Sequence, residues 1–149
     1  MRKMRTVILA ACLGLAGSAT PADAGLSATG NVIAILGGDL FVGEAIGHLS
    51  GAGTLAIHSQ KDPALTCRGQ FTSSAELGGL GQMQCSDGAT ATFSFKRLNI
   101  FRGYGVGSFS RGAMNFTYGL SAEEAGPYLT LPEGKQLRQS GTELTLVDL

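Results

Sequence analysis

The sequence has no surplus of charge of either sign. Lysine and arginine together number 11, aspartate and glutamate also number 11, and charged residues make up only 15% of the chain. Proteins that bind nucleic acid or an anionic membrane surface usually carry a basic excess. Its absence argues against nucleic acid and anionic membrane surfaces as partners.

Histidine and long hydrophobic runs are also scarce. His48 and His58 have no cysteine near them in sequence, and neither Glu44 nor Asp39 completes a zinc-binding spacing with them. We therefore expect no metal and no cofactor. Beyond the N-terminal leader no apolar run approaches the roughly 18 residues that a membrane span needs, so we expect no transmembrane span.

Patterns that carry catalysis are missing as well. Ser50 lies in Gly-His-Leu-Ser-Gly, which differs from the Gly-x-Ser-x-Gly elbow of hydrolases. The Gly-x-Gly elements at residues 51–53, 79–81 and 105–107 are not followed by a helix that could hold a phosphate. With no acid, base and nucleophile set in view, we expect a protein that is not an enzyme.

The chain does have an N-terminal leader. A basic start and an apolar run to residue 19 precede Ala22-Asp23-Ala24, a small-residue cleavage motif. Residues 1–24 are therefore predicted to be a signal peptide, and the protein to be exported to the periplasm or secreted. An alternative is a lipid-anchored envelope protein, because Leu9-Ala10-Ala11-Cys12 resembles the motif at which bacterial lipoproteins are acylated on cysteine, here Cys12.

Cleavage after Ala24 would leave about one domain's length of chain. It would remove three basic residues and one acidic residue, so the mature chain would carry eight basic and ten acidic residues. We divide this chain into a β-rich core domain, residues 25–119, and a C-terminal segment, residues 120–149. The segment either completes the sheet or forms a loosely ordered tail.

Alternating apolar and polar residues predict strands in the core domain. Cys67 and Phe71 share the inward face of one strand, and Gly81 and Cys85 that of the next. Cys67 and Cys85 are the only cysteines beyond the leader, and an even pair in an exported protein predicts a disulfide.

Turn residues predict how the following strands pair. A three-residue loop at Asp87–Ala89 with Gly88 in a left-handed conformation, and a two-residue turn at Arg111-Gly112, keep the apolar faces together. Aromatic rings then cover strand glycines, which compensates for the missing side chains. The predicted pairs are Gly81 with Phe95, Gly107 with Phe116 and Gly105 with Tyr118.

Several of these positions form a recognisable pattern: Cys-x-Gly-x-Phe at residues 67–71, Gly-x-Gly-x-x-x-Cys-x-Asp-Gly at 79–88, Phe-x-Phe at 93–95, Gly-x-Gly-x-Gly at 103–107 and Phe-Thr-Tyr-Gly at 116–119. The pattern resembles a group of small, exported, functionally uncharacterised bacterial β-rich proteins and covers roughly residues 43–119. Because its motifs are turn, glycine and cysteine positions, the resemblance implies a fold and an envelope location, and no catalytic residue.

We predict an all-β fold, an antiparallel meander of about seven or eight strands that forms a small barrel or a strongly twisted sheet with one disulfide. The leading hypothesis for function is a non-catalytic exported or cell-envelope protein with a structural or partner-binding role. A carrier with an apolar barrel cavity is the alternative, and a hydrolase the third. The inward phenylalanines and methionines look sufficient to fill a small barrel, which favours the first.

The candidate binding loop lies between residues 96 and 104, where cations and aromatic residues gather: Lys96, Arg97, Phe101, Arg102 and Tyr104. Loops on a rigid scaffold commonly carry binding residues, here for an unknown envelope or extracellular partner. The alternative is a solvated hairpin loop with its apolar residues folded underneath.

The leader gives a first prediction. N-terminal sequencing of the exported protein should begin at Gly25, because cleavage follows Ala24. A blocked, acylated Cys12 at the N-terminus would show lipoprotein processing instead.

Overall fold

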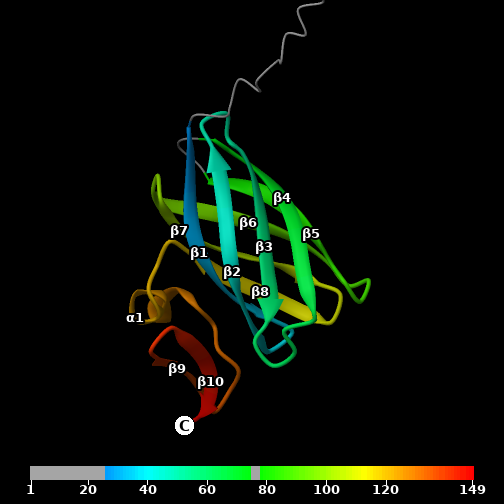
Figure 1. Ribbon diagram of the computed structural model, residues 1–149, viewed down its shortest axis with the longest axis vertical. Coiled ribbons are helices and arrows are strands. Elements are labelled where there is room, and N and C mark those ends of the chain that lie inside the picture. The colour runs from blue at the N-terminus through cyan, green and yellow to red at the C-terminus, as the bar shows by residue number, and fades with distance from the viewer. Residues whose placement is uncertain (1–25, 75–77) are drawn as a thin grey trace, which may run out of the picture.

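The structure, a computed structural model, describes residues 26–74 and 78–149, so the predicted signal peptide and Cys12 lie outside the described residues. Eight strands form a closed antiparallel barrel in chain order, and β8 pairs with β1 to close it (Figure 1). This confirms the predicted all-β meander. The strands are β1 Ser27–Leu36, β2 Asp39–His48, β3 Ala52–Ser59, β4 Thr66–Ser74, β5 Gly78–Cys85, β6 Thr90–Asn99, β7 Arg102–Phe109 and β8 Gly112–Tyr118.

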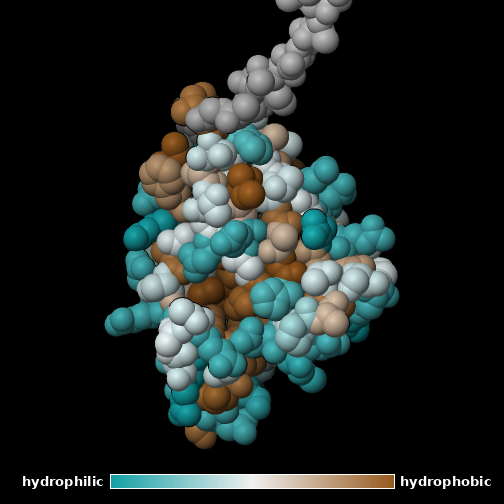
Figure 2. Space-filling view, in the orientation of Figure 1, coloured by the Kyte–Doolittle hydropathy of each residue, from teal (hydrophilic) through white to brown (hydrophobic). Residues whose placement is uncertain are grey.

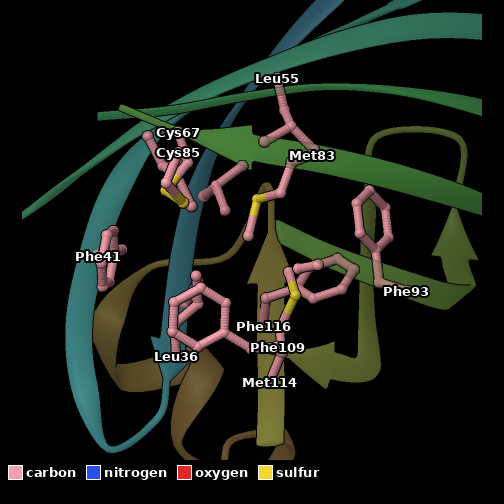
Figure 3. Close-up of a cluster of buried hydrophobic side chains, with 14 of the residues drawn as sticks. Leu36, Phe41, Leu55, Cys67, Met83, Cys85, Phe93, Phe109, Met114 and Phe116 are labelled. Atoms are coloured by element: carbon pink, nitrogen blue, oxygen red, sulfur yellow. A yellow bond between two sulfur atoms is a disulfide. The ribbon is translucent and has the colours of Figure 1, made fainter. Parts of the chain in front are cut away.

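The barrel is filled by side chains from its own strands. Figure 3 shows aromatic rings, methionines and the disulfide pointing into one shared interior. The rings pack edge to face, with centroids 5.3 Å apart for Phe93 and Phe116 and 5.6 Å apart for Phe71 and Phe95. An eight-stranded barrel is just wide enough for its side chains to fill, and this interior is packed as predicted.

Glycines and aromatic rings alternate around the barrel. Strands β3, β5 and β7 supply inward glycines, and the next strand along the chain supplies a ring directly opposite five of them, while Gly107 of β7 lies opposite Met114. A Cβ added at Gly81 would lie 2.3 Å from Cζ of Phe93, so each ring occupies the space that a side chain would need. The five pairs are Gly53–Phe71, Gly79–Phe95, Gly81–Phe93, Gly103–Tyr118 and Gly105–Phe116.

These pairs correct two predicted registers. The β5–β6 loop is Ser86-Asp87-Gly88, because the Gly88 N–H donates to the Cys85 carbonyl (3.0 Å) and the Cys85 N–H donates to the Ala89 carbonyl (2.8 Å). Gly88 has the predicted positive φ, 89°. The predicted loop began one residue too late, so the register was wrong by two residues and Gly81 lies opposite Phe93 instead of Phe95.

The β7–β8 register was wrong by the same amount. Phe109 pairs with Gly112 across Ser110-Arg111, which sets Gly105 opposite Phe116 and Gly103 opposite Tyr118. A two-residue shift leaves each side chain on its predicted face, because side chains alternate with period two. The predicted inward faces were therefore right although their partners were not. The Gly-x-Gly elements also lie largely within strands and not before them.

The predicted disulfide joins Cys67 of β4 to Cys85 of β5. The two residues lie directly opposite each other in the ladder, and both are buried. In the chain-entropy account, closing a loop with a sequence separation of 18 stabilises the fold by about 3 kcal/mol. The bond therefore reinforces strand pairing that the register already specifies.

The C-terminal segment follows neither predicted alternative. It comprises α1 Ala122–Ala125, η1 Gly126–Tyr128, β9 Lys135–Ser140 and β10 Glu143–Asp148, and its two strands form a separate sheet. The segment covers the outer face of β1 and β2, where Ile33, Ile35 and Leu40 pack with Leu120, Ala125, Leu129 and Leu144. The second half of β1, Val32–Leu36, is apolar on both faces, and this covering keeps its outward side chains from water.

The glycine–ring packing gives a second prediction. Gly81→Ala and Gly107→Ala should each cost about 1–3 kcal/mol of unfolding free energy, because their Cβ atoms would overlap Phe93 and neighbouring backbone oxygens. Gly126→Ala is the matched control, since no atom lies within 4 Å of its Cβ and its φ is −46°. Chemical denaturation measures all three. Equal stability of the three variants would contradict the packing.

Candidate binding surface at one end of the barrel

The residues of the candidate binding loop do not share one loop. Strand β6 continues to Asn99 and β7 begins at Arg102, so the connection itself is only Ile100 and Phe101. Lys96 and Arg97 lie on β6, and Arg102 and Tyr104 on β7. Alternation along these strands sends their side chains to different faces, and the five do not form a single site.

Arg97 turns into the barrel. Its Nη2 donates a hydrogen bond of 2.6 Å to Oγ of Ser73 on β4. Tyr118, on β8, lies close enough for the two to interact electrostatically: burial raises the pKa of the Tyr118 hydroxyl, and the positive charge of Arg97 partly offsets that rise. Arg97 therefore closes the interior with a polar layer above the rings.

Arg102 and Tyr104 contact the C-terminal segment. Nη1 of Arg102 lies 2.8 Å from Oε2 of Glu124, and Tyr104 stacks on Tyr128 with ring centroids 4.8 Å apart. The N–H and hydroxyl of Ser121 hydrogen-bond to Glu124 and, ahead of Arg102, lower the pKa of its carboxyl. Arg102 and Tyr104 therefore attach α1 and η1 to the barrel wall.

The turn between β6 and β7 is held by its backbone while its side chains project. The Phe101 N–H donates to Oδ1 of Asn99 at 2.8 Å, and the pairing shifts register between Arg97 and Asn99. The Phe101 carbonyl lies against Gly119, where an added Cβ would be 2.0 Å from the oxygen and φ is +71°. Glycine at residue 119 lets the chain leave β8 beneath this turn.

Large hydrophobic side chains are exposed at this end of the barrel. Leu49 is 75% exposed, Ile100 64%, Leu26 63% and Phe101 61%. We call these four, with Leu98 at the end of β6, the apolar end. They come from the start of β1, the β2–β3 turn and the β6–β7 hairpin, and Figure 2 shows hydrophobic atoms gathered there.

Backbone contacts hold these parts of the apolar end near one another. The Leu49 N–H donates to the Leu26 carbonyl at 3.1 Å. A Cβ at Gly30 of β1 would lie 3.8 Å from the Phe101 carbonyl, so the β6–β7 turn lies beside the first half of β1. That half of β1 is free for this contact because β8 pairs with β1 only over Val32–Leu36.

The opposite end of the barrel has different chemistry. Its connections carry ion pairs, Arg111 with Asp87 at 2.8 Å and Lys61 with Asp39 at 4.0 Å. The Ala89 N–H, and then Arg111, lower the pKa of the Asp87 carboxyl. None of the ten large hydrophobic side chains exposed among the described residues lies in these connections. This end has the polar and charged turns expected of a solvated barrel end.

Other surfaces offer little chemistry. Within the described part of the chain no three His, Cys, Asp or Glu side chains lie together as metal ligands would. Nδ1 of His48 is buried without a hydrogen-bond partner, but among the described residues His48 belongs to no cluster of three or more potential metal ligands. Two open grooves share Thr54, Gln70, Gln82 and Thr92 in their lining; the first also includes His48, and the second Glu44 and Arg68.

Leu26 and Leu49 were not predicted from the sequence as parts of a site. Strands of an antiparallel meander alternate in direction, so every second connection lies at the same end. Counting connections would have placed the start of β1, the β2–β3 turn and the β6–β7 turn together. Each of these three segments contains large hydrophobic residues, and this was the signal in the sequence that could have indicated a common surface.

Comparison with known proteins returned no match: no family model, no curated protein and no solved structure is similar to this chain. Across residues 26–74 and 78–149, no helix is both long and apolar enough to cross a membrane.

The exposure of the apolar end gives a third prediction. The double substitution Ile100→Ser and Phe101→Ser should change the unfolding free energy by no more than about 0.5 kcal/mol per residue, because neither side chain is packed. Phe93→Ala, in the interior, should cost about 3–5 kcal/mol. Denaturant titration distinguishes the two. A large loss from the serine pair would show that these residues fold under the loop.

Proposed function

We propose that this protein is a non-catalytic, exported binding protein that acts through its apolar end. The observation that carries the proposal is the difference between the two barrel ends: five of the ten exposed large hydrophobic side chains in the described residues lie at one end, and none in the connections of the other. Exposed apolar side chains that lie together mark an interaction surface, because their exposure to water does not stabilise the protein.

The filled interior supports this proposal over the apolar-ligand carrier. A carrier needs a cavity, whereas here Phe93, Phe95 and Phe116 contact other rings across the interior. The inward glycines do not open space, since the opposite rings occupy it. Binding is therefore assigned to the outside of the barrel.

Photo-crosslinking in cells that export the protein tests the proposal. A photoreactive phenylalanine analogue placed at Leu49 or at Ile100 should give one defined adduct, to protein or to lipid. Leu80 and Val106 are the matched control positions, because they are apolar and 67% and 60% exposed but lie on the outer strand faces. If all four positions give the same adducts, or none gives any, the apolar end is not a binding surface.

A further inference from the structure

We infer that the partner of the apolar end is the surface of a lipid bilayer, into which its apolar turns insert. This inference rests on the proposed function and specifies its partner. It depends on three features of the described residues: the way the apolar side chains project, the place where the chain enters the barrel, and the distribution of charge along the molecule.

The apolar side chains project from separate segments. Leu26, Leu49 and Ile100 are each at least 63% exposed, and each lies in a different connection or strand start. A protein partner would need a matching surface packed closely around each one. The boundary between headgroups and acyl chains accepts projecting apolar side chains without a matching shape.

The chain enters the barrel at this same end. Leu26 is the first described residue and belongs to the apolar end. A lipid on Cys12, or a leader still held in the membrane before cleavage, would therefore be joined to the barrel through the apolar end. The turns would then be held where they can insert.

Charge is distributed unevenly along the molecule. Lys96 is exposed on β6 next to the apolar turns, whereas Arg97 points into the barrel, and the described connections at this end contain no Asp or Glu; Glu76, in the β4–β5 connection, lies outside the described residues. Of the nine described acidic residues, three lie at the opposite barrel end, five in the C-terminal segment and one, Glu44, within β2; the first two groups are Asp39, Asp62 and Asp87, and Glu123, Glu124, Glu133, Glu143 and Asp148.

This distribution qualifies the argument from total charge. In the described residues most carboxylates lie at the opposite barrel end or in the C-terminal segment, where Glu124 is paired with Arg102. Lys96 is exposed and forms no ion pair among the described residues. The unpaired charge of Lys96 would attract an anionic bilayer to this end, with the apolar turns toward the lipid.

Vesicle flotation of the mature chain tests the inference. The protein should float with vesicles of phosphatidylethanolamine and phosphatidylglycerol. Ile100→Ser with Phe101→Ser should lower the partition coefficient at least about tenfold, because the inserted apolar surface is lost. Leu80→Ser with Val106→Ser, equally exposed on the strand faces, should leave it unchanged.

A second pair of variants tests the contribution of charge to vesicle binding. Lys96→Gln should weaken binding to these vesicles about fivefold and have no effect with phosphatidylcholine vesicles. Lys61→Gln, at the opposite end, should have no effect with either. Failure of the wild-type chain to float, together with protein adducts at Leu49 and Ile100, would overturn the lipid partner and keep the binding surface. Equal losses from both serine pairs would also overturn it.

Discussion

The fold depends on contacts between inward aromatic rings and inward glycines on the strands beside them. The interior of an eight-stranded barrel is narrow and close-packed. A large inward side chain on one strand therefore fits only if the neighbouring strand has a small residue opposite it. Strands β3, β5 and β7 provide that space, and β4, β6 and β8 fill it. Edge-to-face contacts then join rings from different hairpins, such as Phe95 with Tyr118 at 5.7 Å.

The packing of the interior determines where function can lie. Because rings occupy the space over the glycines, a ligand has no room inside, and the outer wall of β1 and β2 is covered by the C-terminal segment. The turns remain as possible sites of function, and the turns at the two ends of the barrel differ in chemistry. Ion pairs and polar turns occupy one end, while Leu49, Ile100 and Phe101 are exposed at the other.

Much of this arrangement could be predicted from the sequence, because period-two alternation is a local property. It predicted the inward faces, the pairing of Cys67 with Cys85 and the filled interior. The registers were harder to predict. Moving the loop from Asp87–Ala89 to Ser86-Asp87-Gly88 changes the cross-strand partner of every residue but leaves each side chain on the same face of the sheet. Both versions bury the same side chains, so hydrophobic patterning does not discriminate between them.

The candidate site was harder to predict for a different reason. Residues 96–104 were predicted to form one loop, whereas they comprise the end of one strand, a two-residue turn and the start of the next strand. The surface that remains combines segments far apart in sequence, and only closure of the barrel places Phe101 beside Gly30. The C-terminal segment was also unpredictable in detail, since its strands are stabilised by packing against Ile33 and Ile35.

The central claim, that rings lie directly over glycines, can be tested by proton NMR of the folded protein. The account predicts nuclear Overhauser contacts from the Phe93 ring to the Hα protons of Gly81, and from the Phe116 ring to those of Gly105, with ring-current shifts of these Hα resonances. Ordinary glycine Hα shifts without these contacts, or contacts from Phe95 to Gly81 in their place, would contradict it.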